Sequence, residues 1–283
     1  MTFTSQAIHD EAERVLAQVA VPKRPKRIVC LTEETVEVLY RLGAGDLVAG
    51  VSIYVRRPPE ARQKPRVSAF IKADFAKIEA LQPDLVLCFS DLQAEIAAEC
   101  VRRGLEVVVF NQRSVSEILG VVLALGALVG RESAAAALAD ELTENLRAAA
   151  RRAASWSRRP RVYFEEWPDP MISGIRWVSE LVTIAGGEDL FSELSHGKLA
   201  KERFVDPAEV VRRQPELILA SWCGKRVKRD QILGRTGWEE VPAIRDGEVH
   251  EISSTLILQP GPAALSDGLF EVQRHIERLA TRA

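Results

Sequence analysis

The chain of 283 residues is 47% hydrophobic and 28% charged, which is close to the average of folded globular proteins and excludes a disordered chain. Its length is compatible with one large domain or with two smaller lobes, and either can bury a sizeable core. The 38 basic and 40 acidic side chains sum to a formal net charge of −2 at pH 7, so we expect neither nucleic acid nor an anionic membrane surface as a partner.

The first 20 residues of the chain have the pattern of an acidic amphipathic helix. They lack the basic start, the apolar stretch and the small-residue cleavage site of a signal peptide. The sequence as written therefore predicts a cytoplasmic protein, and the periplasm is the alternative if a signal peptide was removed. No apolar run reaches the ~18 residues that cross a bilayer, so we expect no membrane insertion.

Strand patterns alternate with helical patterns along the rest of the chain. Strands are predicted near residues 27–31, 47–51, 85–89 and 106–110 in the first half, and near 161–165, 217–221 and 248–252 in the second. This alternation is typical of an α/β fold with mainly parallel sheets. We expect two Rossmann-like lobes.

Two segments of the chain resemble each other, "KIEALQPDLVLCFS" at 77–90 and "EVVRRQPELILASW" at 209–222. In each, a helical pattern is followed by Gln-Pro, an acidic residue and an apolar run. Pro83 and Pro215 cannot continue a helix, so each marks the passage from a helix to a strand. Upstream, each half has a basic strand and then a helix followed by a glycine, Gly43 or Gly186, where a positive φ is expected.

A stretch without glycine or proline, residues 131–156, separates the two halves and is rich in strong helix formers. It predicts one continuous helix of ~26 residues, about 39 Å long, that joins the lobes as a stiff strut. The expected organisation is an N-terminal helical extension at 1–25, an α/β lobe at 26–130, a linking helix at 131–157 and a second α/β lobe at 158–283.

The segment "PMISGIRWVSELVTIAGGEDLF" at 170–191 predicts a helix that begins near Val178. Arg176 and Trp177 then lie on the loop that enters this helix. Trp177 is either a lid over a flat ligand or a packing residue of its lobe, and we favour the lid.

Motifs of common enzymes and of metal sites are missing from the sequence. It contains no Walker A loop, HExxH, GxSxG or CxxC. The cysteines are interpreted as buried, reduced thiols, and the histidines lie far apart without the spacing of metal ligands. These residues are Cys30, Cys88, Cys100, Cys223, His9, His196, His250 and His275.

Aromatic residues gather at the predicted carboxyl ends of strands, where parallel sheets bind ligands. Phe89 ends one strand, and Trp167 and Trp222 follow two others. Tyr54 and Phe70 lie in loops of the first half. Together these rings would offer a broad apolar surface to a large flat ligand, although Phe89 taken alone is more typical of a core residue at a strand end.

The chain resembles the class III, helix-linked substrate-binding proteins of ABC importers, in particular their cobalamin-binding branch. The resemblance covers about residues 25–280 and is carried by "RIVCLTEETVEVLYRLGAGDLVAGVS", "VSIYVRRPPEA", "VSAF", "KIEALQPDLVLCF" and "RVYFEEWPDPMISGIRWVSELVTIAGGEDLF". It implies a monomeric binding protein with no catalytic residue, no bound metal ion and no intrinsic cofactor. The implied ligand is a cobalamin-like corrinoid held between the lobes, with little lobe motion on binding.

The resemblance also implies which side chains contact the ligand. Tyr54, Phe70 and Phe89 match positions at which the family places aromatic rings against the corrin. In the second lobe a familiar phenylalanine position falls on Glu166, and neighbouring residues are expected to substitute for the missing rings. The candidate ligand-binding residues are Tyr54, Phe70, Phe89, Glu166, Trp167, Arg176, Trp177 and Trp222.

An ABC permease is the implied partner of such a protein. Family members carry one surface glutamate on each lobe that contacts arginines of the permease. Here the matching positions are Ala76 and Ala208, and Glu79 and Glu209 lie close enough in sequence to replace them.

Haem or a ferric siderophore is the alternative ligand, because proteins that bind these chelates share the fold. Cations on the expected cleft loops, Arg56, Arg57, Lys72 and Arg176, could face such an anionic ligand.

A cytoplasmic corrinoid-handling enzyme ranks lowest. Its only candidate acidic pair, Glu165 and Glu166, is adjacent in an extended strand and so points to opposite faces.

Overall fold

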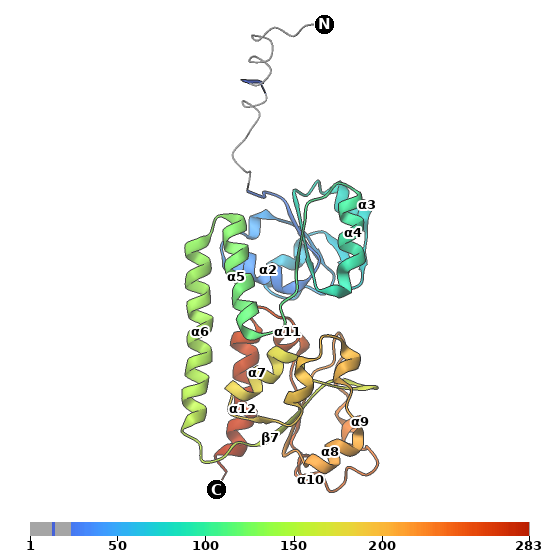
Figure 1. Ribbon diagram of the computed structural model, residues 1–283, viewed down its shortest axis with the longest axis vertical. Helices are drawn as coiled ribbons and strands as arrows, with labels where there is room; N and C mark the ends of the chain where they lie inside the picture. The colour runs from blue at the N-terminus through green and yellow to red at the C-terminus, as the bar shows by residue number, and fades with distance from the viewer. Residues whose placement is uncertain (1–12, 15–23, 283) are drawn as a thin grey trace.

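The structure is a computed structural model that describes residues 13, 14 and 24–282 (Figure 1). Most of the helix predicted for residues 1–20 lies outside the described residues. The chain from residue 24 onward forms two α/β lobes, with one long helix running beside both of them. The predicted fold class is confirmed.

The first lobe contains a six-stranded sheet in the order β4-β3-β2-β1-β5-β6. All its pairs are parallel except β3 with β4. Helices α2 and α5 pack on one face and α3 and α4 on the other, so both faces are buried. The elements are β1 (Ile28–Cys30), α2 (Glu33–Arg41), β2 (Val48–Ser52), β3 (Arg66–Ala69), β4 (Lys72–Ala73), α3 (Phe75–Ala80), β5 (Leu85–Phe89), α4 (Ala94–Arg102), β6 (Val107–Phe110) and α5 (Val115–Val129).

The second lobe has a five-stranded sheet in the order β11-β10-β7-β8, and β9 also pairs with β7. Only the β7–β8 pair is antiparallel. The elements are β7 (Arg161–Pro168), β8 (Met171–Ser173), α7 (Arg176–Ile184), β9 (Glu188–Asp189), α8 (Pro207–Arg213), β10 (Leu217–Ala220), α9 (Arg229–Leu233), α10 (Pro242–Arg245), β11 (Val249–Glu251), α11 (Ser254–Ile257) and α12 (Leu269–Ala280). The short strands β3, β4, β8 and β9 were not predicted from the sequence.

Short helical segments connect these elements. Five are 3-10 helices and the last is a π-helix: η1 (Gly45–Leu47), η2 (Pro59–Gln63), η3 (Asp91–Gln93), η4 (Ser192–His196), η5 (Ala200–Arg203) and η6 (Ala264–Gly268). No helix among the described residues combines the length and the apolar character needed to cross a membrane.

The sequence repeat occupies equivalent places in the two sheets. Strand β5 pairs in parallel with β1, and β10 pairs in parallel with β7. The glutamine that precedes the repeat's proline has a positive φ in both copies, 47° at Gln82 and 51° at Gln214. Gly43 and Gly186 have the positive φ values expected after a helix, 68° and 96°. The two lobes are thus built on one local pattern.

Helix α6 (Glu132–Ala154) is the predicted strut. It runs without interruption for 23 residues, about 35 Å, and lies alongside both lobes (Figure 1). Its buried residues Leu138, Leu142 and Ala149 belong to one hydrophobic cluster that includes Ile28 of the first sheet and Phe164 of the second. The two lobes therefore share a continuous core.

The prediction that all four cysteines are buried is wrong for one of them. Cys30, Cys88 and Cys100 are buried, whereas Cys223 is exposed. Cys223 differs because it lies in the loop that follows β10, at the edge where strands of the second sheet end.

Two histidines that are far apart in the sequence come together in the fold. The rings of His250 and His275 stack with their centroids 4.3 Å apart, because β11 and α12 bring them together. His250 Nε2 lies 3.0 Å from Glu248 Oε2, and the guanidinium of Arg278 contacts both side chains. Burial lowers the pKa of His275 to about 4, and the charges of His250 and Arg274 act in the same direction.

The stacked pair predicts a loss of stability in acid. The folded pKa of His275 is about 4 and its ordinary value is 6.5, so the unfolded chain binds more protons between these pH values. The free energy of unfolding should fall as the pH drops through this window. His275→Phe keeps a stacked ring without the titration, and urea unfolding at pH 7 and pH 4.5 should show a smaller acid loss, by about 1 kcal/mol or more. His196→Phe, at an exposed position, is the control and should keep the wild-type pH dependence.

Candidate ligand-binding cleft

Two adjoining cavities lie between the lobes. The first has a volume of about 450 Å³ and the second about 280 Å³. Residues that line both are Phe70, Phe89, Cys223 and Leu258, so the cavities form one cleft with walls from both lobes. The first cavity alone falls within the size range of small-molecule sites.

Five of the predicted aromatic residues lie on this cleft. Tyr54, Phe70 and Phe89 line the first cavity. The two phenylalanines also line the second cavity, together with Trp167 and the largely buried Trp177. Tyr54 is 42% exposed and Phe89 only 6%. The arrangement follows from parallel strands, whose carboxyl ends meet at one edge of a sheet. Contact of these rings with a ligand stays a prediction.

A buried glutamine holds the backbone at two of these aromatic residues. Gln93 Oε1 accepts a hydrogen bond from the backbone N–H of Phe89 at 2.9 Å, and its Nε2 donates to the carbonyl of Phe70 at 2.7 Å. Gln93 is fully buried. The sequence analysis did not find this residue, because its role depends on loops that meet only in the folded chain.

Trp167 presents its ring at the rim of the second cavity. The ring is partly buried, and Lys225 Nζ lies 4.5 Å from its centroid. Trp167 Nε1 donates to the carbonyl of Asp169 at 3.1 Å, which fixes the orientation of the ring. A cation over an indole face is attracted by the ring's quadrupole.

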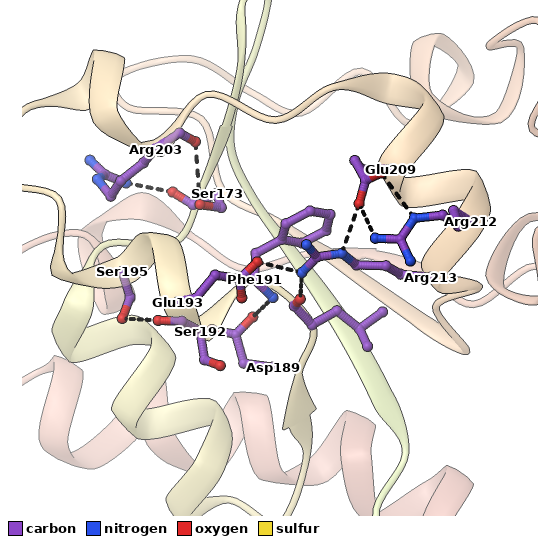
Figure 2. Close-up of polar contacts among 11 residues, drawn as sticks. Ser173, Asp189, Phe191, Ser192, Glu193, Ser195, Arg203, Glu209, Arg212 and Arg213 are labelled. Atoms are coloured by element: carbon purple, nitrogen blue, oxygen red, sulfur yellow. Dashed lines mark hydrogen bonds and ion pairs between the residues drawn. The ribbon is translucent and has the colours of Figure 1, made fainter.

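Glu166 lies on the second cavity, but its carboxylate is already occupied. The Nη1 and Nη2 atoms of Arg203 donate to it at 2.7 and 2.9 Å, and the backbone N–H of Ile175 donates at 3.0 Å. Arg203 also donates to the carbonyl of Ser173 (Figure 2 shows these two residues). Glu166 therefore positions the segment before α7, and Arg203 was missed by sequence reasoning.

Trp222 does not reach the cleft, in contrast to the prediction. It is 3% exposed and belongs to the core of the second lobe, where its Nε1 donates to Glu165 Oε1 at 3.2 Å. Glu165 is fully buried and forms a two-bond ion pair with Arg235. The ring of Trp222 lies inside the lobe, where its N–H supplies one of the hydrogen bonds that stabilise the buried carboxylate of Glu165.

Trp177 is a packing residue, so the preferred interpretation as a lid is wrong. It is the second residue of α7 and not a loop residue, is 3% exposed, and lies against the second cavity. Its Nε1 donates to the carbonyl of Ile257 at 2.8 Å. The indole thus connects α7 to α11 under the cleft.

Arg176 also begins α7, but it lines neither of the two cavities. Its Nε donates to Glu180 Oε1 at 2.9 Å. It lines a separate hollow beside Val115 and His196, none of whose residues line the two cavities. Its assignment to the cleft is therefore a wrong prediction.

Two adjacent carboxyl groups lie against the first cavity. Glu33 is 8% exposed and Glu34 is 3% exposed, and both belong to the first turn of α2. Burial and, after it, the neighbouring charge of Glu33 together raise the pKa of Glu34 to about 8, against the opposing hydrogen bond from Thr32. Burial also raises the pKa of Glu33, while Ser52 and Arg56 act in the opposite direction.

Charged residues of both signs surround the first cavity in equal number. The acidic ones are Glu33, Glu34 and Glu251, and the basic ones are Arg56, Lys225 and Arg226. Among the described residues no three His, Cys, Asp or Glu side chains are grouped closely enough to hold a metal ion.

The positions expected to contact a permease are exposed. Ala76 lies on α3 and Ala208 on α8. The nearby glutamates are held within the chain, because Glu79 pairs with Arg103 and Glu209 pairs with two arginines of its own helix, as Figure 2 shows. Docking through these glutamates stays a prediction.

Comparison with known proteins relates this cleft to a family. The family model described as periplasmic binding protein matches residues 28–256. The chain belongs to this family. It is 25% identical over 268 residues to an uncharacterised ABC transporter substrate-binding lipoprotein of Bacillus subtilis, which covers 91% of the chain and 82% of the relative.

Two further similarities bear on the ligand. A vitamin B12-binding protein of Vibrio parahaemolyticus is 26% identical over 255 residues, covering 89% of this chain and 90% of that one. The structure of a periplasmic haem-binding protein from Roseiflexus sp. RS-1 in its apo form superposes with a TM-score of 0.75, at 21% identity, covering 89% and 99% of the two chains. The chain described here is thus a substrate-binding protein of the ABC uptake type and not an enzyme.

The buried position of Trp177 predicts a stability defect. Trp177→Ala removes a large core ring and leaves the Ile257 carbonyl without its donor, so the binding protein should lose about 3 to 5 kcal/mol of unfolding free energy in urea. Tyr54→Ala, at an exposed ring of the cleft, is the control and should cost less than about 1 kcal/mol. If the Trp177 variant is as stable as the wild type, the interpretation of Trp177 as a lid is correct and its packing role is overturned.

The raised pKa of Glu34 predicts that the binding protein loses stability as the pH rises. The folded state holds more protons than the unfolded chain between the ordinary pKa of 4.5 and the folded value of about 8, so the unfolding free energy falls as the pH increases through this window. Glu34→Gln imitates the protonated form. In urea unfolding, the free energy of unfolding of this variant should equal that of the wild type near pH 5. At pH 9 it should be higher than that of the wild type by on the order of a few kcal/mol. Glu79→Gln, at an exposed site, should show no such gain.

Proposed function

We propose that this substrate-binding protein binds a cobalamin-like corrinoid in the cleft between its lobes. The observation that carries the proposal is the set of aromatic rings from both lobes, Tyr54, Phe70, Phe89 and Trp167, around two contiguous cavities. Such rings contribute apolar area and stacking surfaces at little entropic cost. A wide, flat, conjugated ligand can stack on several of these rings at once.

Few of the cations considered for haem or a ferric siderophore lie on the cleft. Only Arg56 lines it. Arg57 forms ion pairs with Glu37 and Asp267, Arg176 lies on another hollow, and Lys72 lines neither cavity. Other cations, Lys225 and Arg226 of the first cavity and Arg113, Lys198 and Arg203 of the second, remain, so haem or a ferric siderophore stays the alternative ligand.

Similarity of sequence supports the same ligand. The relative from Vibrio parahaemolyticus, whose name is vitamin B12-binding protein, matches nearly the whole chain. We extend its ligand to this chain because the aromatic rings of the cleft agree with it. The linking helix and the shared core further favour binding with small adjustments of side chains and loops over wide closure.

Titration with cyanocobalamin, haemin and a ferric hydroxamate tests the proposal. Calorimetry or absorbance should show saturable binding that is tightest for cyanocobalamin. Tyr54→Ala and Phe70→Ala should each weaken it about 5-fold, since one stacked ring contributes roughly 1 kcal/mol. Phe270→Ala, at an exposed ring on α12 that lines neither cavity, is the matched control and should bind as the wild type does.

The exposed thiol of Cys223 reports where the ligand lies. Because the other three cysteines are buried, a thiol reagent should modify Cys223 first, and bound cyanocobalamin should slow this reaction. If haemin or the hydroxamate binds more tightly than cyanocobalamin, the proposed ligand is wrong and the tighter ligand takes its place in the proposal. Undiminished labelling of Cys223 in a saturated complex would place the ligand elsewhere.

A further inference from the structure

The second cavity of the cleft is suited to a part of a ligand. Its volume of about 280 Å³ is below the ~300 Å³ at which small-molecule sites usually begin. Phe70, Phe89 and Trp167 line it together with aliphatic residues such as Leu199 and Leu258. A flat apolar group at the end of a larger ligand matches this lining, because it can pack and stack on such side chains.

Most charged residues of the second cavity are paired with each other. Asp91 Oδ1 lies 2.7 Å from Nη2 of Arg113, and Glu166 Oε2 lies 2.7 Å from Nη1 of Arg203. Lys198 is the remaining charged residue that lines this cavity, and it is exposed. Because the paired groups compensate each other's charge, an uncharged group of a ligand can lie beside them.

A lysine lies where the two cavities meet. Lys225 lines the first cavity, and its Nζ lies 4.5 Å from the ring centroid of Trp167, which lines the second. This ammonium group forms no ion pair with any acidic side chain that the structure describes. The indole face attracts the ammonium group but does not neutralise it. An anionic group of a ligand that extends from one cavity into the other would gain a counter-charge here.

The order of these features matches the nucleotide arm of a complete corrinoid. Such an arm leaves the edge of the flat ring, continues with a negatively charged phosphodiester and ends in a flat aromatic base. Cobinamide has the same ring but neither the phosphate nor the base. The ring would then occupy the first cavity, the phosphodiester the junction and the base the second cavity.

We propose that the second cavity binds the aromatic base of this arm and that Lys225 binds its phosphodiester, so that the protein selects complete corrinoids over those that lack the base. The proposal rests on the proposed function and deepens it, because it assigns the two cavities to two parts of one ligand. Trp167 and Lys225 are then specificity-determining residues. Tyr54 lines the first cavity alone and serves the ring that all corrinoids share.

Three ligands that differ by one part at a time test this assignment: dicyanocobinamide, dicyanocobinamide phosphate and cyanocobalamin. Calorimetry should show that the wild type prefers the phosphate and cyanocobalamin to cobinamide. Lys225→Ala should lower both preferences about 3- to 5-fold, as for an exposed ion pair, and high salt should abolish this difference from the wild type. Trp167→Ala should lower the preference for cyanocobalamin about 5-fold, and more than the preference for the phosphate.

Lys228→Ala is the matched control for the loss of a lysine. Lys228 lies on the same loop as Lys225, is exposed and lines neither cavity, so this variant should keep both preferences. Tyr54→Ala should weaken the binding of all three ligands and keep their ratios. Each variant is compared with the wild type on the same ligands, so differences between the ligands themselves cancel. Urea unfolding checks that each variant is folded.

The outcomes separate the two proposals. If the wild type binds all three corrinoids equally well, the assignment of the second cavity is overturned and the corrinoid function stands. If Lys225→Ala or Trp167→Ala weakens all three ligands by the same factor, that residue serves the ring and its assignment to the arm is overturned. If the wild type binds none of the corrinoids, the proposed function falls, and the assignment of the second cavity with it.

Discussion

A buried carboxylate on α2 joins the two lobes beside the cleft. Glu37 accepts the backbone N–H of Ala263 and pairs with Arg57, which also pairs with Asp267. Because the first turn of α2 and the segment before Ala263 both line the first cavity, this network fixes how the two walls face each other. A pair of this kind is costly to break, since the partner left behind is a buried, uncompensated charge.

The cleft contains groups that reduce the stability of the empty protein. Glu33 and Glu34 are buried side by side, and Glu34 has a strongly raised pKa. Such groups are typical of functional sites, where a ligand provides what the protein does not. The aromatic residues of the cleft, in contrast, do not reduce stability. Gln93 holds the backbone of Phe89 and Phe70 by hydrogen bonds within the chain. The loops that carry the rings are thus held in place by bonds within the chain.

Local patterns predicted the fold well and the orientation of side chains less well. Both lobes could be recognised because their repeat is a local pattern. In each lobe, neighbouring residues encode a helix, then Pro83 or Pro215, then a buried strand. The start of α7 could not be predicted in this way. Glu166 on β7, nine residues earlier, accepts a hydrogen bond from the backbone N–H of Ile175, the residue before the helix. Trp177 and Trp222 turn inward for the same reason, since each donates to an oxygen that only the folded chain brings near. The Glu180 that holds Arg176 is four residues along the same helix, so that contact could have been found from the sequence.

The core shared through α6 has a consequence for how the protein unfolds. Buried residues of α6 pack in one cluster with Ile28 of the first sheet and Phe164 of the second, so one face of each sheet belongs to a core that both lobes share. The lobes should therefore melt together in a single cooperative transition, where two domains on a flexible tether would melt in two. A ligand that contacts only the rims of the cleft then protects the far ends of both sheets, because no part of the shared core opens without the rest.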